Sequence, residues 1–277
     1  MVEIAFGELA GWQVSWIVLD WRDCELMKMG RLAGISGILL GLGSIAVLAQ
    51  QAAPAPASAA VAPDPMRTDW ANLKRFHDED AALGLPAAGE KRVVFMGDSI
   101  TQGWVHHGVP PEPAVVGKDY VNRGISGQTT PQMLVRFRPD VIDLKPAAVV
   151  ILAGINDIAG NTGDMTLEQT EGNLASMAEL AQAHGIKVVM CSILPAFDIP
   201  WRAGREPAAK VVAVNTWMKA YAAEHGHVYV DYYSAMADER GGLPKTLSND
   251  GVHPTPAGYA VMQPLVDAGV AKALGGN

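Results

Sequence analysis

Short apolar runs alternate with amphipathic stretches along the chain from about residue 91 onward. Two of the runs, 147–154 and 186–194, are continuously apolar, which is typical of strands covered on both faces. Runs at 92–96, 119–124 and 227–233 complete five candidate strands. This alternation predicts an α/β fold with three layers, in which helices cover both faces of a central parallel sheet of about five strands.

Capping signals mark the helices between these strands. Thr166 and Gln169 form a capping-box pattern at the start of an amphipathic stretch. The pairs Thr130-Pro131 and Thr255-Pro256 each predict an N-cap followed by a proline in the first turn. We interpret the apolar stripes of these helices as core positions, because nothing in them suggests a cofactor site.

Polar clusters follow the candidate strands. In parallel sheets with helices on both faces, ligands bind beyond the carboxyl ends of the strands. Residues 97–99, 122–124 and 154–157 occupy such positions after three strands. A fourth cluster, 249–253, lies in a loop before the C-terminal helix, which can carry it over the same edge. We expect all four clusters to converge on one site.

The first 67 residues have a different pattern. Residues 32–48 carry no charge, follow a short basic region, and lead into an Ala/Pro-rich stretch. This order predicts a signal peptide over 27–49, with cleavage near Ala49, and a linker over 50–67. The domain 68–277 would then be secreted or periplasmic, with no stable membrane partner.

Two alternatives bear on this N-terminal segment. Residues 1–26 contain five acidic residues and one basic one, which does not suit a signal peptide, so we interpret them as a non-native or misassigned extension. The apolar run is also near the lower limit of ~17 residues for a membrane-spanning helix. An uncleaved membrane anchor therefore stays open as the less favoured interpretation.

Composition narrows the function classes. The net charge of −8 gives no basic field for nucleic acid, so we expect no nucleic-acid partner. Only Cys24 and Cys191 are present, which excludes a disulfide framework or a cysteine zinc site. No H-E-x-x-H pattern or aspartate-rich calcium loop occurs either, and we expect neither a metal nor an organic cofactor. The oligomeric state stays open.

The polar clusters supply the parts that acyl transfer needs, which are a nucleophile, a base, a group that orients the base, and oxyanion donors. Ser99 offers the hydroxyl and His253 a base. Asp250, three residues before His253, can hold the imidazole tautomer. The Gly124 N–H, which no side chain shields, and the Asn156 amide can donate to a developing negative charge.

Each of these residues also has a structural interpretation. Ser99 can cap the helix that follows it, and Asn156 can cap its own segment. His253 can fix the turn before the last helix, and Asp250 can form an Asx turn with the glycine after it. Gly124 can be present only for a positive φ angle.

The four blocks GDSI (97–100), NRGISGQT (122–129), GIND (154–157) and DGVHP (250–254) resemble, in order and spacing, the signature blocks of the SGNH hydrolases, or GDSL esterase family. The resemblance covers roughly residues 68–273 and implies a flavodoxin-like α/β/α sandwich. It also implies that Ser99 attacks, His253 acts as base and Asp250 orients it, with an oxyanion hole of Ser99 N–H, Gly124 N–H and the Asn156 amide. The G-x-S-x-G elbow of α/β-hydrolases is absent.

The sequence therefore predicts a serine esterase that acts on a small-molecule ester through an acyl-serine intermediate. The resemblance favours short acyl groups, and we lean to acetyl-type esters, among them those on carbohydrates. A thioesterase, lysophospholipase or acyltransferase with the same residues is the enzymatic alternative, and a non-catalytic carbohydrate-binding module is the non-enzymatic one. Candidate substrate-lining residues are Trp104, Phe197 and Trp201.

Overall fold

The computed structural model describes residues 68–106 and 120–276. The predicted extension, signal peptide and linker lie outside these residues. Within the described ranges, no helix is long and apolar enough to cross a membrane.

Five short strands form one sheet in the order β2-β1-β3-β4-β5, and every neighbouring pair is parallel. This confirms the predicted sheet. In the register, Gly97 is level with Gly124 on one side and Leu152 on the other, so three strands end together. The strands are β1 (Val93–Gly97), β2 (Tyr120–Gly124), β3 (Ala148–Leu152), β4 (Lys187–Cys191) and β5 (Val228–Val230).

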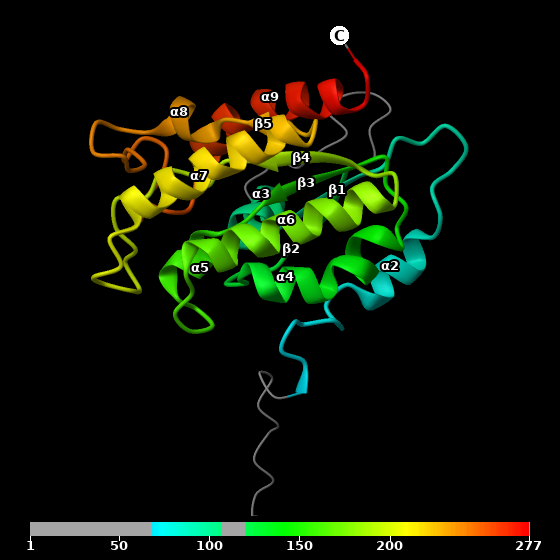
Figure 1. Cartoon of the computed structure of the whole chain (residues 1–277), viewed down its shortest axis with the longest axis horizontal. Helices are drawn as coiled ribbons and strands as arrows, with labels where there is room; N and C mark the ends of the chain where they lie inside the picture. The colour runs from blue at the N-terminus through cyan, green and yellow to red at the C-terminus, as the bar shows by residue number, and fades with distance from the viewer. Residues whose placement is uncertain (1–67, 107–119, 277) are drawn as a thin grey trace, which may run out of the picture. The chain divides into compact units, whose positions relative to one another are not determined.

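Helices cover both faces of this sheet. Figure 1 shows α4, α6 and α7 in front of the strands, where α4 contacts α6 and α6 contacts α7. On the opposite face, α3 packs on β1 and β2, and α9 packs on β3, β4 and β5. The helices are α2 (His77–Leu83), α3 (Ser99–His106), α4 (Thr130–Phe137) with the π-helical turn η2 (Arg138–Ile142), α5 (Ile155–Ala159), α6 (Leu167–Ala183), α7 (Pro207–Glu224), α8 (Tyr232–Met236) and α9 (Pro256–Ala273).

Local signals place most helix starts as predicted. Thr166 is the N-cap of α6, and its hydroxyl accepts the Gln169 N–H at 3.2 Å. Thr255 is the N-cap of α9. The start of α4 differs by one residue, because Thr129 is the N-cap and Thr130 lies in the first turn. The Thr130 hydroxyl donates to the Asp157 carboxylate, and this hydrogen bond holds Thr130 in the first turn of α4.

The core lies between the sheet and the two helix layers. All five residues of β1 and of β3 are buried, as expected for strands covered on both faces. Asp98 and Ser99 follow β1 directly, and Asn156 and Asp157 follow the end of β3 after three intervening residues. The fold therefore brings these clusters to one edge of the sheet.

Candidate active site

Ser99 is the first residue of α3, and it meets a histidine from the far end of the chain. Its Oγ lies 2.9 Å from His253 Nε2. His253 comes from the loop before α9, which packs over the same side of the sheet as α3. The structure thus joins the first and the last predicted cluster through a hydrogen bond.

The Asp250 carboxylate contacts both the backbone N–H and the imidazole ring of His253. One carboxylate oxygen, Oδ1, accepts the N–H groups of Val252 and His253 at 2.9 and 2.8 Å. The other, Oδ2, lies 2.7 Å from His253 Nδ1. Burial opposes ionisation of Asp250, but these hydrogen bonds outweigh it and lower its pKa to about 2. Asp250 therefore makes the loop turn, and the same carboxylate is placed where it could orient the imidazole.

Asn156 is buried at the start of α5, beside the loop between β2 and α4. Its Nδ2 donates to the Gln128 carbonyl at 2.9 Å, and its Oδ1 accepts from Asn161 Nδ2 at 2.9 Å. An amide nitrogen carries two N–H groups, so one remains beyond the bond to Gln128. Asn156 thus has a fixed orientation and a spare donor.

Gly124 does not fit its predicted role as an oxyanion donor. Its N–H already donates to Asn122 Oδ1 at 2.8 Å. A Cβ at Gly124 would lie 2.2 Å from the Gln102 backbone nitrogen, so glycine is required because β2 approaches α3 closely. The prediction from sequence was wrong, and so was the positive-φ alternative, since Gly124 is not among the positive-φ glycines of the described chain.

Gly127, in the same sequence block, has the properties expected of Gly124. It has a φ of +77° and would have no backbone atom within 4 Å of an added Cβ. On one side, the Ser126 N–H donates to Gln102 Oε1 of α3 at 2.7 Å; on the other, Gln128 accepts from Asn156. Within the described residues the Gly127 N–H has no hydrogen-bond partner. The Ser-Gly pair before a helix start was the overlooked turn signal.

A fully buried arginine, Arg136 of α4, ties these segments together. Its guanidinium donates to Gln128 Oε1 at 2.5 Å, to Asp140 Oδ2 at 2.8 Å and to the Gly97 carbonyl at 3.0 Å. Gly97 precedes the nucleophile turn, and Gln128 belongs to the loop that contacts Asn156. Sequence analysis missed Arg136, because a single arginine in an amphipathic helix resembles a surface residue.

Two buried carboxyl groups lie next to the site residues. Burial raises the pKa of Asp98 to about 7, although its Oδ1 accepts the Ile100 N–H at 2.9 Å. Burial likewise raises the pKa of Asp157 to about 6, against hydrogen bonds from Thr130 and Thr170. These carboxyls fix the turns that carry Ser99 and Asn156.

The three candidate substrate-lining aromatics behave differently. Trp104 is 1% exposed and packs between Phe95 and Tyr259 in the core, so its predicted contact with substrate is wrong. Trp201 is 43% exposed, and its ring centroid lies 5.5 Å from that of His253. Phe197 is also exposed, but the Arg240 guanidinium lies 4.9 Å from its ring centroid.

In the part of the chain that the structure describes, no group of three or more histidine, cysteine, aspartate or glutamate side chains is placed to hold a metal ion. The hydrogen-bonded series from Asp250 through His253 to Ser99 is arranged so that it could move a proton away from a serine hydroxyl. Residues 95–261 match the GDSL-like Lipase/Acylhydrolase family. The chain belongs to this family. It is accordingly an ester hydrolase of the GDSL type.

Individual relatives are similar to different shares of this chain. A solved structure of a GDSL-like lipase from Bacteroides thetaiotaomicron is 48% identical, with a TM-score of 0.71, and the match covers 74% of this hydrolase and all of that chain. An acetylxylan esterase from Geobacillus stearothermophilus is 29% identical over 63% of this chain and 91% of its own. The lipoprotein YqeF of Bacillus subtilis is 32% identical over 42% of this chain; the match spans only 53% of YqeF.

Proposed function

We propose that this hydrolase cleaves short-chain, acetyl-type carboxylic esters through an acyl-serine intermediate. The observation that supports this most is the continuous contact from Asp250 Oδ2 to His253 Nδ1 and from His253 Nε2 to Ser99 Oγ, at 2.7 and 2.9 Å. A non-catalytic binding module would have no need of this alignment.

In the first half-reaction, Ser99 Oγ attacks the ester carbonyl carbon while His253 Nε2 takes the hydroxyl proton. Ionised Asp250 stabilises the imidazolium that forms. The tetrahedral intermediate then collapses, the bond to the alcohol oxygen breaks, and His253 returns the proton to that oxygen. In the second half-reaction, water attacks the acyl-serine with His253 again as base, which releases the acid and restores Ser99.

The negative charge on the tetrahedral oxygen needs fixed donors. We assign these to the Ser99 N–H, the Gly127 N–H and Asn156 Nδ2, with Gly127 in place of Gly124. Gly127 is favoured because its N–H is unpaired in the described chain and its neighbours contact both α3 and Asn156. Gly124 is disfavoured because Asn122 already accepts its N–H.

The acyl group is proposed to be acetyl, and carbohydrate acetyl esters are the favoured substrates. One support is the acetylxylan esterase among the relatives, of which this chain covers 91%. The acidic character of the chain, with a net charge of −8, also suits an uncharged substrate better than a polyanion.

The test is burst kinetics on p-nitrophenyl acetate, butyrate and octanoate with the wild type and Ser99→Ala. We expect a burst of nitrophenolate equal to the enzyme concentration, the fastest turnover for acetate, and a loss of about 10⁴- to 10⁶-fold in kcat for Ser99→Ala. Ser176→Ala serves as the matched control, because that exposed hydroxyl on α6 donates only to the Gly172 carbonyl. Equal activity of wild type and Ser99→Ala would refute the nucleophile, and faster turnover of thioesters of the same acids would favour the thioesterase alternative.

A further inference from the structure

Trp201 lies directly beside the proposed catalytic base. The indole and imidazole centroids are 5.5 Å apart, with an angle of 32° between the ring planes. Trp201 nevertheless keeps 43% of its surface exposed, so a face or edge of the indole remains available to a ligand. A large, exposed aromatic side chain at an active site is a typical contact for a substrate group.

The chemistry of His253 determines which part of the substrate comes near Trp201. His253 Nε2 passes the proton of Ser99 to the oxygen of the departing alcohol. That oxygen must therefore lie within hydrogen-bond reach of the imidazole, whereas the carbonyl oxygen lies at the oxyanion donors. A side chain packed against the imidazole thus borders the alcohol, not the acyl group.

The segment between β4 and α7 that carries Trp201 is held at several points. Ile199 is fully buried, and its carbonyl accepts the Arg202 N–H at 2.9 Å. Further along, Arg205 Nη1 pairs with Asp164 Oδ1 at 2.6 Å, and its guanidinium packs on Gly160 beside the Asn156 helix. Trp201 is therefore positioned before substrate arrives, which lowers the entropic cost of binding.

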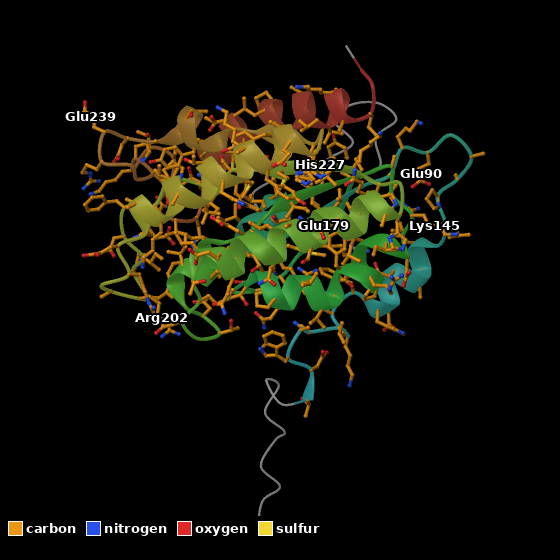
Figure 2. The ribbon with its side chains drawn as sticks, in the orientation of Figure 1. Glu90, Lys145, Glu179, Arg202, His227 and Glu239 are labelled. Carbon is orange, nitrogen blue, oxygen red and sulfur yellow. The ribbon has the colours of Figure 1, made fainter. Side chains whose placement is uncertain are left out.

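The charge around Trp201 bears on the chemistry of the alcohol. An exposed tryptophan face accepts a sugar ring or a cation. Arg202 follows Trp201 directly in the chain; the hydrogen bond from Arg205 and, to a smaller extent, the charge of Arg202 lower the pKa of Asp164. Figure 2 shows Arg202 at one end of the sheet and Glu90 and Lys145 at the other. Since Glu90 and Lys145 precede β1 and β3, Arg202 lies at the carboxyl end of the strands. The segment 195–205 carries Arg202 and Arg205 against a single carboxylate, Asp198, and this excess of positive charge disfavours a cationic alcohol and leaves a neutral ring.

We propose that Trp201 is a leaving-group platform that stacks on the pyranose ring of an acetylated sugar. This proposal rests on the proposed esterase function and makes one residue, Trp201, responsible for the choice of substrate class. The platform makes the enzyme prefer an acetyl ester of a sugar over an acetyl ester of a small open-chain alcohol.

The test compares two acetyl esters, methyl tri-O-acetyl-β-xylopyranoside and ethyl acetate, by titration of the released acetic acid, with acetylcholine assayed alongside as a cationic acetyl ester. The measured quantity is the ratio of their kcat/KM values, in the wild type, Trp201→Ala and Trp201→Phe. We expect Trp201→Ala to lower the ratio of sugar to ethyl ester about 10-fold, mainly through KM, and Trp201→Phe to restore part of it. Val212→Ala is the control, because Val212 is an exposed apolar residue of α7, the helix that follows this segment, and it should keep the wild-type ratio.

Three outcomes would overturn the platform. An unchanged ratio in Trp201→Ala shows that the indole does not contact the sugar. An equal loss on both esters assigns Trp201 to holding His253 instead. A wild-type preference for acetylcholine over both esters, lost in Trp201→Ala, makes the site one for a cation. If the wild type cleaves none of these esters, the proposed esterase function is refuted. If it cleaves them and one of the three outcomes above is found, only the proposed role of Trp201 is refuted.

Discussion

The buried pair of Arg136 and Asp140 makes the sharpest prediction about how this active site is held. Replacing Arg136 by Met removes three hydrogen bonds and leaves Asp140 as an uncompensated carboxylate, with its side chain 2% exposed. Breaking one partner of a buried ion pair costs about 3–5 kcal/mol. In a domain of this size that lowers Tm by about 6–20 °C.

The loss should depend on pH with a definite sign. Burial already raises the pKa of Asp140 in spite of Arg136, and without the guanidinium the pKa rises further. A carboxyl whose folded pKa lies above its unfolded value stabilises the fold fully below the unfolded pKa, and this stability is lost as pH rises through the folded pKa. Arg136→Met should therefore be less destabilised at pH 5 than at pH 8, as measured by urea unfolding.

A double variant separates charge from geometry. Arg136→Met with Asp140→Leu removes both charges, so we expect it to recover most of the unfolding free energy and to lose the pH dependence. It still lacks the hydrogen bonds to Gly97 and Gln128, so kcat on p-nitrophenyl acetate should stay about 10- to 100-fold low. A double variant that is stable and fully active would refute the positioning role of Arg136, and a pH-independent single variant would refute the electrostatic argument.

Two further predictions concern the nucleophile turn and the oxyanion loop. Because burial raises the pKa of Asp98 to about 7, the free energy of unfolding of the wild type should fall by about 2–3 kcal/mol between pH 5 and 8 from this group alone. Thermal melts of Asp98→Asn should show a shallower decline of Tm over this range, and the decline that remains should come from Asp157. Gly124→Ala should destabilise or prevent folding, since its Cβ meets the Gln102 backbone. Gly127→Ala keeps its N–H and should fold with a strain of about 1 kcal/mol, and kcat should fall because relaxation of the +77° φ turns that N–H away from the site. Melting and turnover of both variants check these expectations, and a Gly124→Ala with wild-type Tm and activity would refute the close approach of β2 to α3.

The strand pattern was predictable because the apolar runs of β1 and β3 are continuous and end at glycine or polar residues. The convergence of Ser99, Asp250 and His253 was predictable too, since each follows a strand or precedes a helix, and the structure joins them by hydrogen bonds. Their roles, and that of Asn156, stay predictions that rest on the family resemblance. The choice between Gly124 and Gly127 was not predictable, because it depends on whether Asn122 folds back onto its own strand. Trp104 was misplaced for a similar reason: its position after Ser99 says nothing about the side of α3 that faces the core. Arg136 needs contacts from three distant segments, which no local pattern encodes.

The order of these segments along the chain has a consequence for biosynthesis. Ser99, Gly127 and Asn156 belong to β1, β2, β3 and the turns after them, which a ribosome completes before residue 160. The base and its carboxylate lie at residues 250–253, and α9, which follows directly, contacts β3, β4 and β5. With the proposed triad, a nascent chain has its nucleophile long before it has the base that deprotonates it. We therefore expect ester cleavage to begin only when α9 has docked on the sheet.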